Sequence, residues 1–232
     1  VSYEEHYVIN LLNEKVKKDS HDQHYIAPLL WKESFHNLPT LESFKLSYVR
    51  YLIMEKQALS LGRFDECVAQ IQNLLDKNYA SEMSQEEYSK SHAKAYYNPV
   101  FLIHPKGKRT RLIWDLAAKI KGKCLNDYIL SGPNLYNNLM ELIFKMREHK
   151  FMFKSDIQEM FHQIKVDDDD TNALRFLFRF HPNDKIKIYK LNVLPFGASC
   201  SPVISQYVKD KVAEDYKDKN PIPCQLIQKS CY

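Results

Sequence analysis

Residues 174–191 read LRFLFRFHPNDKIKIYKL. Two strand-like runs, 174–180 and 185–191, flank the turn-forming residues at 181–184, so this stretch predicts a β-hairpin. Working upstream, a second hairpin is expected from strands at 100–103 and 110–114, which a turn at 106–108 would join. Strands within a hairpin are antiparallel, which distinguishes this pattern from a regular βαβ fold.

Further predicted elements surround these hairpins. Residues 151–157 (FMFKSDI) predict a strand with a polar end, and the spacing of apolar residues predicts a helix over 134–149. Ser201 is expected to cap another helix, with Pro202 at its first position. Residues 1–93 show mainly helical spacing. We therefore expect an α+β fold in two parts, a helical N-terminal region over 1–93 and a mixed region over 94–232.

The N-terminal region is expected to form a helical layer that packs on the mixed region. The apolar residues that fall near one face of its long helix are Phe44, Tyr48, Leu52 and Leu59. Gly62 is expected to end that helix, because glycine readily adopts the left-handed conformation found there. Ser84 and Glu87 have the spacing of a capping box, which predicts a short helix after residue 84.

The composition is that of an ordinary globular chain. Its 232 residues include 33 Lys and Arg against 29 Asp and Glu, which gives a formal net charge of +4, and 44% are hydrophobic. This balance excludes disorder over the whole length and does not by itself indicate nucleic-acid binding. No apolar run of about 20 residues and no signal peptide is visible, so an intracellular location is expected. The five scattered cysteines form no Cys-x-x-Cys pair and favour reduced thiols.

One local cluster of basic residues stands out against this background. Its members are Lys106, Lys108, Arg109, Arg111, Lys119, Lys121 and Lys123. Alternation along a strand places Arg109 and Arg111 on one face, where guanidinium groups can grip phosphate oxygens. The other interpretation is a solvated hairpin tip, which composition alone favours slightly.

Two stretches contain acidic residues that could bind a metal. Asp156 ends the predicted strand 151–157, where a carboxylate beside apolar residues needs a cation or a donor, and Mg²⁺ prefers oxygen ligands. For a lone aspartate, capping the next turn is the more common role. The run at 167–170 (DDDD) is expected to be an exposed loop rather than a metal site.

Residues 194–202 (LPFGASCSP) form the other distinctive segment. Gly197 permits a tight turn or the close approach of a flat ligand, and the helix start that follows favours anions. A plain strand-to-helix loop is an equally good interpretation of this segment alone. Cys200 has no base paired with it in a motif, so we expect a buried small residue rather than a nucleophile.

Taken in order, three segments resemble the reverse transcriptases of retroelements. They are 109–115 (RTRLIWD), 153–164 (FKSDIQEMFHQI) and 194–202. More narrowly, they resemble the Pao/BEL class of long-terminal-repeat retrotransposons, as do 125–127 (LND) with 132–133 (GP), and 173–177 (ALRFL). The helical stretch 25–80 resembles that class more weakly.

The resemblance implies a right-hand polymerase fold, of which this chain would supply the fingers and part of the palm. Asp156 would be the first catalytic aspartate and a ligand of Mg²⁺, two ions of which serve the intact enzyme. The implied nucleotide-binding residues are Arg111, Lys106, Lys108, Phe161, Phe196 and Gly197. Phe161 would exclude a ribose 2′-hydroxyl group. Arg109, Lys119, Lys121 and Lys123 are further candidates for contacting nucleic acid.

The sequence departs from this family in one important respect. The family has a Tyr-x-Asp-Asp hairpin after the helix that follows 194–202, and the 232 residues contain none. Tyr232 stands where that hairpin is expected to begin. We therefore expect a fragment that does not polymerise alone, because one aspartate cannot hold two divalent ions. A non-catalytic nucleic-acid-binding module and a protein-interaction scaffold are the alternatives.

The resemblance also implies partners and a location. Template-primer RNA or DNA and deoxynucleotides would be the ligands, and no membrane is expected to be involved. The rest of a polyprotein, with thumb, RNase H and integrase, is a further expected partner. The location would be cytoplasmic or within retrotransposon particles.

Overall fold

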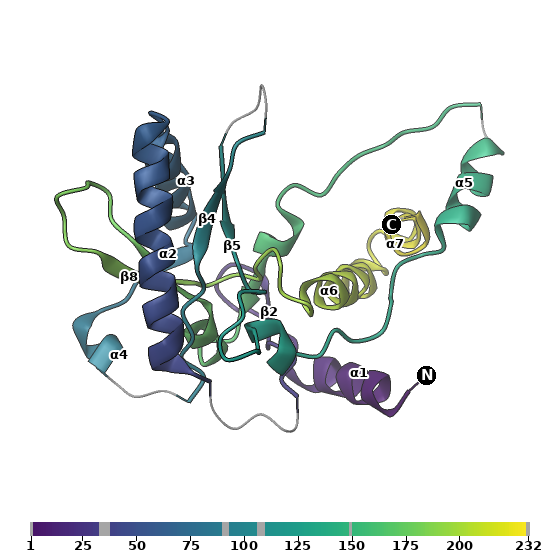
Figure 1. The fold of residues 1–232 in the computed structure, drawn as a ribbon. Coiled ribbons are helices and arrows are strands. Elements are labelled where there is room, and N and C mark those ends of the chain that lie inside the picture. Colours follow the sequence, from purple (N-terminus) through teal and green to yellow (C-terminus); the bar gives the residue numbers. More distant parts are fainter. Residues whose placement is uncertain (1, 33–37, 90–92, 106–109, 149, 231–232) are drawn as a thin grey trace.

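The structure is a computed structural model that describes residues 2–32, 38–89, 93–105, 110–148 and 150–230 (Figure 1). Its helices are α1 (Tyr3–Lys15), α2 (Thr40–Ser60), α3 (Phe64–Asp76), α4 (Gln85–Ser89), α5 (Leu139–Arg147), α6 (Ser201–Tyr216) and α7 (Pro221–Ser230). Its strands are β1 (Lys17–Lys18), β2 (Tyr25–Ala27), β3 (Ala80–Glu82), β4 (Val100–Ile103), β5 (Arg111–Trp114), β6 (Ile164–Val166), β7 (Arg175–Phe178) and β8 (Lys187–Leu191). Short 3₁₀ helices cover Leu125–Tyr128, Met160–Gln163 and Asp170–Leu174. None of the described helices has the length and apolar character that crossing a bilayer requires.

Three small sheets give the chain a mixed α/β architecture. Strands β4 and β5 pair antiparallel, as do β7 and β8, so both predicted hairpins are confirmed. Strand β3 extends the second hairpin in the order β3-β8-β7, and β1-β2-β6 forms the third sheet. Strand β2 pairs with β6 in parallel, and β3 pairs with β8 antiparallel. Strands from the first 93 residues therefore complete sheets of the later region, while the division into two parts stays a prediction.

One part of the hydrophobic core, which also includes residues of α1, β2, β6 and α6, lies where α2 and α3 cover the β7–β8 hairpin. Phe176 and Phe178 from β7 and Tyr189 from β8 are fully buried, and Tyr51 from α2 meets Phe178 edge to face. Phe64 at the start of α3 stacks on the same Phe178 ring at a centroid distance of 6.1 Å. The single ring of Phe178 thus joins both helices to the sheet, whereas Phe176 contacts the rings of Trp114 and Tyr189 in the strands.

The prediction of which face of α2 is buried was wrong. Tyr48, Leu52 and Leu59 are exposed, and of the four predicted residues only Phe44 packs against the core. The residues that the helix buries are Ser43, Ser47, Tyr51, Met54, Glu55 and Ala58. Polar contacts select this face, because Tyr51 and Glu55 meet Arg179 and the two serines meet backbone groups.

The helix ends agree with the sequence in some places and not in others. Gly62 has φ +61° just after α2, and Ser84 and Glu87 form the predicted capping box of α4. The helix predicted over 134–149 is shorter, because the side chain of Asn138 caps it and α5 begins at Leu139. Ser201 is the first residue of α6 rather than its cap, and its hydroxyl donates to the carbonyl of Pro195 at 2.6 Å.

The acidic run at 167–170 is only partly the exposed loop that was predicted. Asp168 and Asp169 are exposed, whereas Asp170 is 2% exposed. The Asp170 carboxylate accepts hydrogen bonds from the Leu29 backbone N–H at 2.7 Å and from the Trp31 indole at 2.8 Å. A buried carboxylate needs such donors, so Asp170 joins the N-terminal segment to the start of β7.

Candidate active site

Strands β4 and β5 position the predicted arginine of the nucleotide site. Arg111 is exposed at the first position of β5, opposite Ile103. Helix α3 covers the free edge of β5, where Glu66 accepts from the Thr110 N–H and Gln70 accepts from the Leu112 N–H, each at 3.0 Å. These two side chains replace the missing neighbouring strand and fix the hairpin against α3.

The electrostatics of this edge favour a charged Glu66. Hydrogen bonds from Thr110, followed by those from Arg63, lower the pKa of Glu66 to about 2. Lys106, Lys108 and Arg109 lie outside the described residues, so the predicted pairing of Arg109 with Arg111 stays a prediction.

The turn at 195–199 lies against the other end of β5. Gly197 has φ +97°, and a Cβ placed there would lie 3.7 Å from the Trp114 carbonyl oxygen. That distance is an ordinary contact, so the positive φ, rather than lack of space, requires glycine. Asn126 fixes the turn from the side: its Nδ2 donates to the Gly197 carbonyl at 2.9 Å, and its Oδ1 accepts from the Ser199 N–H at 3.0 Å.

Aromatic residues join this turn to the 3₁₀ helix at Met160–Gln163. The ring of Phe196 lies 4.9 Å from that of Phe161 and 5.1 Å from that of His162, centroid to centroid. Phe196 is 54% exposed, so this pair of predicted pocket residues forms an aromatic surface beside Gly197. Burial lowers the pKa of His162 and so favours the neutral imidazole among these rings.

Glu159 is held in place by residues just before β3. Lys77 forms an ion pair with it at 2.7 Å, and the hydroxyl group of Tyr79 donates to it at 3.1 Å. The hydrogen bond from Lys77 lowers the pKa of Glu159. Glu159 also has φ +52°, in the left-handed region, which these contacts maintain. Its carboxylate is thus committed to Lys77 and Tyr79, and the turn that carries Phe161 is anchored.

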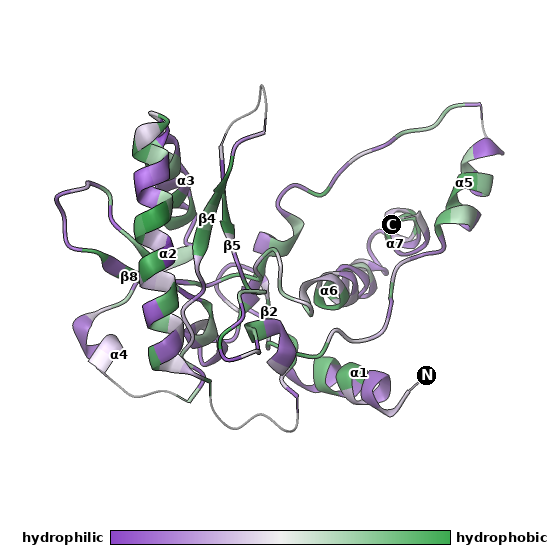
Figure 2. Ribbon diagram, in the orientation of Figure 1, coloured by the Kyte–Doolittle hydropathy of each residue, from purple (hydrophilic) through white to green (hydrophobic). Residues whose placement is uncertain are grey.

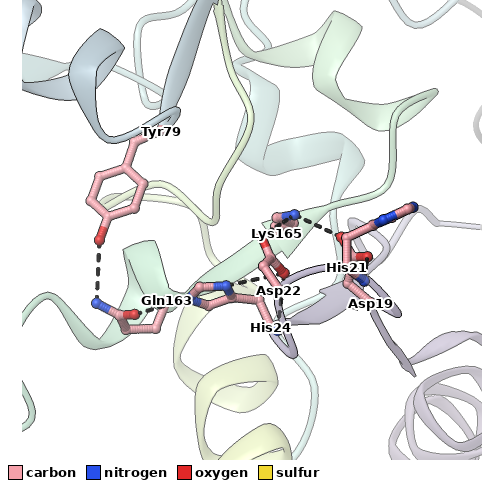
Figure 3. A network of polar contacts seen from close by, with 7 residues as sticks. All are labelled: Asp19, His21, Asp22, His24, Tyr79, Gln163 and Lys165. Atoms are coloured by element: carbon pink, nitrogen blue, oxygen red, sulfur yellow. Dashed lines mark hydrogen bonds and ion pairs between the residues drawn. The ribbon is translucent and has the colours of Figure 1, made fainter.

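A polar network extends from this turn to the N-terminal segment (Figure 3). Gln163 donates to Tyr79 at 3.2 Å through Nε2, and its Oε1 lies 3.3 Å from Nε2 of His24. Two residues further on, Lys165 pairs with Asp19 at 2.7 Å and with Asp22 at 2.6 Å. Sequence reasoning missed this network, because its contacts between segments join residues more than 80 positions apart and no local pattern relates them.

Asp156 does not lie in the strand that was predicted for it. Residues 151–157 have no regular secondary structure, and Figure 1 shows the chain running from α5 toward β6 as an extended arch. Phe153 is 96% exposed, and Asp156 is exposed as well. A strand requires a hydrogen-bonding neighbour, and none of the described strands pairs with this segment.

The predicted site residues are thus brought together only in part. Phe161, Phe196 and Gly197 are neighbours, and Gly197 touches the strand of Arg111 at Trp114. Within the described part of the chain, no hydrogen bond or ion pair joins Asp156 to Arg111 or to the turn at 195–199. Cys200 is buried, as expected, and burial raises the pKa of its thiol to about 12, which excludes a reactive thiolate.

The basic residues after β5 occupy separate environments. Lys121 pairs with Glu42 of α2 at 2.5 Å, and the amine of Lys123 lies 5.7 Å from the ring centre of Tyr128. Lys119 is exposed. These side chains therefore do not form one continuous cationic stripe, and their predicted contact with nucleic acid stays a prediction.

A metal centre is not complete in the described residues. They contain no group of three or more His, Cys, Asp or Glu side chains that could hold a metal ion. Glu159, the carboxylate nearest to Asp156 in sequence, is committed to Lys77 and Tyr79. The donor set around Asp156 therefore does not fit two divalent ions.

Comparison with known protein families shows which family the chain belongs to. Residues 106–232, more than half of the chain, match the family model of reverse transcriptase (RNA-dependent DNA polymerase). The chain belongs to the reverse transcriptase family. No curated protein matches the chain. The reverse transcriptase region includes β5, the aromatic pair and the Gly197 turn, and membership implies binding of a nucleic-acid template and deoxynucleotides in general.

Proposed function

We propose that this chain supplies the fingers and part of the palm of a Pao/BEL-type retrotransposon reverse transcriptase. The observation that supports this most strongly is the meeting of three segments that are distant in sequence. The Phe161 and Phe196 rings are in tilted contact, and Gly197 lies against Trp114 of β5. The third motif therefore contacts both the second motif and the strand that begins at Arg111.

In this proposal the incoming deoxynucleotide lies over the aromatic surface. Arg111 contacts the triphosphate, because a guanidinium group forms paired hydrogen bonds with phosphate oxygens. Phe161 lies against the sugar at C2′ and leaves no room for a hydroxyl group there. The turn at Gly197 lets the backbone approach the base, since glycine has no side chain. Lys106 or Lys108 would supply a companion lysine for the triphosphate.

Asp156 is proposed as one carboxylate ligand of a two-magnesium centre whose further carboxylate ligands do not gather around it within the described residues. Magnesium, when bound, would stabilise the charge that develops during phosphoryl transfer. The exposed apolar residues of 151–157 suit a strand in the complete palm, because a neighbouring strand would satisfy the free backbone groups and a layer packed on the sheet would cover Phe153. Thumb, RNase H and integrase regions of a polyprotein are proposed partners.

Nucleotide binding tests the proposal directly. A fluorescently labelled deoxynucleoside triphosphate is titrated with the 232-residue chain in magnesium buffer, and Arg111→Ala is compared with Arg147→Ala, which alters an exposed arginine on α5. Arg111→Ala should weaken binding about tenfold, the loss expected for one charge-assisted contact. Equal binding by both variants would contradict the assignment of Arg111.

Polymerisation by these 232 residues alone is not expected, because they hold no Tyr-x-Asp-Asp sequence. A primed template incubated with the chain, magnesium and deoxynucleotides should remain unextended. Extension that disappears in Asp156→Asn would show that the described carboxylates suffice, and this part of the proposal would fail while nucleotide binding stood.

A further inference from the structure

Helix α2 turns a hydrophobic face to solvent. Six of its large apolar side chains are between 38% and 61% exposed. They are Leu41, Tyr48, Val49, Leu52, Ile53 and Leu59, and we call them the outer face of α2. Figure 2 shows α2 at the front of the molecule with hydrophobic residues along its length, and in Figure 1 the β4–β5 hairpin stands between α2 and α6. Exposed apolar patches of this kind mark interaction sites in soluble proteins.

The orientation of α2 is fixed by polar contacts on its opposite side. Glu55 is 5% exposed and pairs with Arg179 at 2.6 Å, and the Tyr51 hydroxyl donates to Glu55 at 2.8 Å. Ser47 donates to the Asn98 carbonyl, and Ser43 accepts from the Tyr97 N–H. Rotating the helix to bury the outer face would break these hydrogen bonds and separate the Glu55 carboxylate from the Arg179 guanidinium group. The outer face therefore stays exposed to solvent.

The spacing of the outer face fits a second helix. At about 100° per residue, Leu41, Tyr48, Leu52 and Leu59 fall within roughly 40° of one another and form a straight row. Val49 and Ile53 form a parallel row beside it. Steps of seven, four and seven residues place these four side chains at a and d positions of a heptad repeat, in which Lys45 and the buried Glu55 hold the two intervening positions.

The charges on this surface indicate which kind of partner helix would bind to it. Lys45 and Lys56 are exposed and lie, by the same helical geometry, between the two apolar rows. Of the two acidic residues of α2, Glu55 pairs with Arg179 on the buried side. Glu42 lies in line with Val49 and Ile53 by the same geometry and pairs with Lys121, so the two lysines leave the outer face with a net positive charge. A second copy of the chain would bring lysines against lysines. Parallel α2 helices would place each lysine opposite its own copy, and antiparallel helices centred on the row would bring Lys45 close to Lys56.

We propose that the outer face of α2 binds an acidic amphipathic helix of another protein. The partner would place a row of Leu or Ile side chains against the row from Leu41 to Leu59. Its Glu or Asp residues would meet Lys45 and Lys56. This proposal is independent of polymerase activity, because none of these residues belongs to the nucleotide site.

The test uses two synthetic 21-residue helical peptides with the full 232-residue chain. Both carry Leu at heptad a and d positions; one has Glu at the flanking positions, and its twin has Lys there. Binding is followed by fluorescence anisotropy. The Glu peptide should bind at least about tenfold more tightly than the Lys peptide. The double substitution Leu52→Ser with Ile53→Ser should weaken its binding at least about tenfold.

Two further variants separate surface chemistry from folding. Lys45→Glu with Lys56→Glu should reverse the preference between the peptides. Leu139→Ser with Met140→Ser removes exposed apolar side chains from α5 and should leave binding unchanged. Circular dichroism confirms that each variant is folded.

Three results would overturn the proposal. The first is the absence of binding or equal affinity for both peptides. The second is self-association of the chain at micromolar concentration that Leu52→Ser abolishes, since a second copy would then cover the face. The third is displacement of the Glu peptide by a short RNA duplex.

Discussion

Phe196 contacts Phe161 across 35 residues of sequence, with ring centroids 4.9 Å apart and the ring planes inclined at 44°. The contact joins the turn at 195–199 to the 3₁₀ helix that follows Asp156. Tyr79 and Lys77 hold that 3₁₀ helix through Glu159, so the position of the Phe161 ring depends on residues before β3.

Removing the Phe161 ring should relax nucleotide selection. In Phe161→Ala the space at the proposed C2′ contact opens, so a ribonucleoside triphosphate should compete with a labelled deoxynucleotide nearly as well as the deoxynucleotide does. Competition titrations measure the ratio, and Phe144→Ala, which removes an exposed ring from α5, serves as the control. An unchanged ratio in Phe161→Ala would remove this residue from the proposed site.

The turn at Gly197 should tolerate no side chain. Gly197→Ala forces an L-residue to φ +97° and should lower the free energy of unfolding by about 1–3 kcal/mol. Urea denaturation measures the loss. The control is Ser199→Ala, because the Ser199 hydroxyl is buried and finds no hydrogen-bond partner among the described residues, so its removal should be neutral or stabilising. A Gly197→Ala variant as stable as the parent would show that the turn adapts.

Removing one partner of the Glu55–Arg179 ion pair should lower the free energy of unfolding substantially. Burial opposes ionisation of Glu55, but hydrogen bonds from Arg179 and Tyr51 outweigh it and lower the pKa of Glu55. Arg179→Met leaves this carboxylate buried without its cation and should destabilise the fold by about 3–5 kcal/mol. Adding Glu55→Leu should recover part of that loss in urea denaturation. If the double variant is less stable than Arg179→Met, the pair is not the source of the effect.

Stability should fall at acid pH partly through Lys165. The hydrogen bond from Lys165 lowers the pKa of Asp22 to about 2 and also lowers that of Asp19. The unfolded chain takes up these protons near pH 4, so the stabilisation is present above about pH 4 and is lost as the pH falls toward 2.

Urea midpoints measured between pH 5 and pH 2 check this expectation. Lys165→Met should show a smaller decrease over that range than the parent, because its aspartates titrate nearly as they do when unfolded. The exposed Lys154→Met should keep the parental slope. The same slope in all three proteins would exclude Lys165 as the cause.

The hairpins could be predicted from the sequence, because turn-forming residues and the strand-forming residues beside them specify a hairpin. The turn residues at 181–184 and the flanking strand formers suffice to specify β7 and β8, and the motif order from 109 to 202 suffices to indicate the family. The capping box at Ser84 and the end of α2 near Gly62 follow from the same short-range rules.

The buried face of α2 could not be predicted in this way. Its apolar spacing selects Tyr48, Leu52 and Leu59, whereas the fold buries Glu55, which meets Arg179 from more than 120 residues away. The prediction of a strand at 151–157 was wrong for a related reason. Strand-like composition produces a strand only when a neighbouring chain segment accepts its backbone hydrogen bonds.

The sequence by itself therefore determined the hairpins, several helix ends and the reverse transcriptase family, since these follow from short-range sterics, capping and ordered motifs. Tertiary structure alone decided that Phe161 meets Phe196, that Glu159 is bound by Lys77, and that α2 presents its apolar side to solvent. Those outcomes depend on which distant groups satisfy a buried charge or an unpaired backbone group, and that choice is made only when the whole chain has folded.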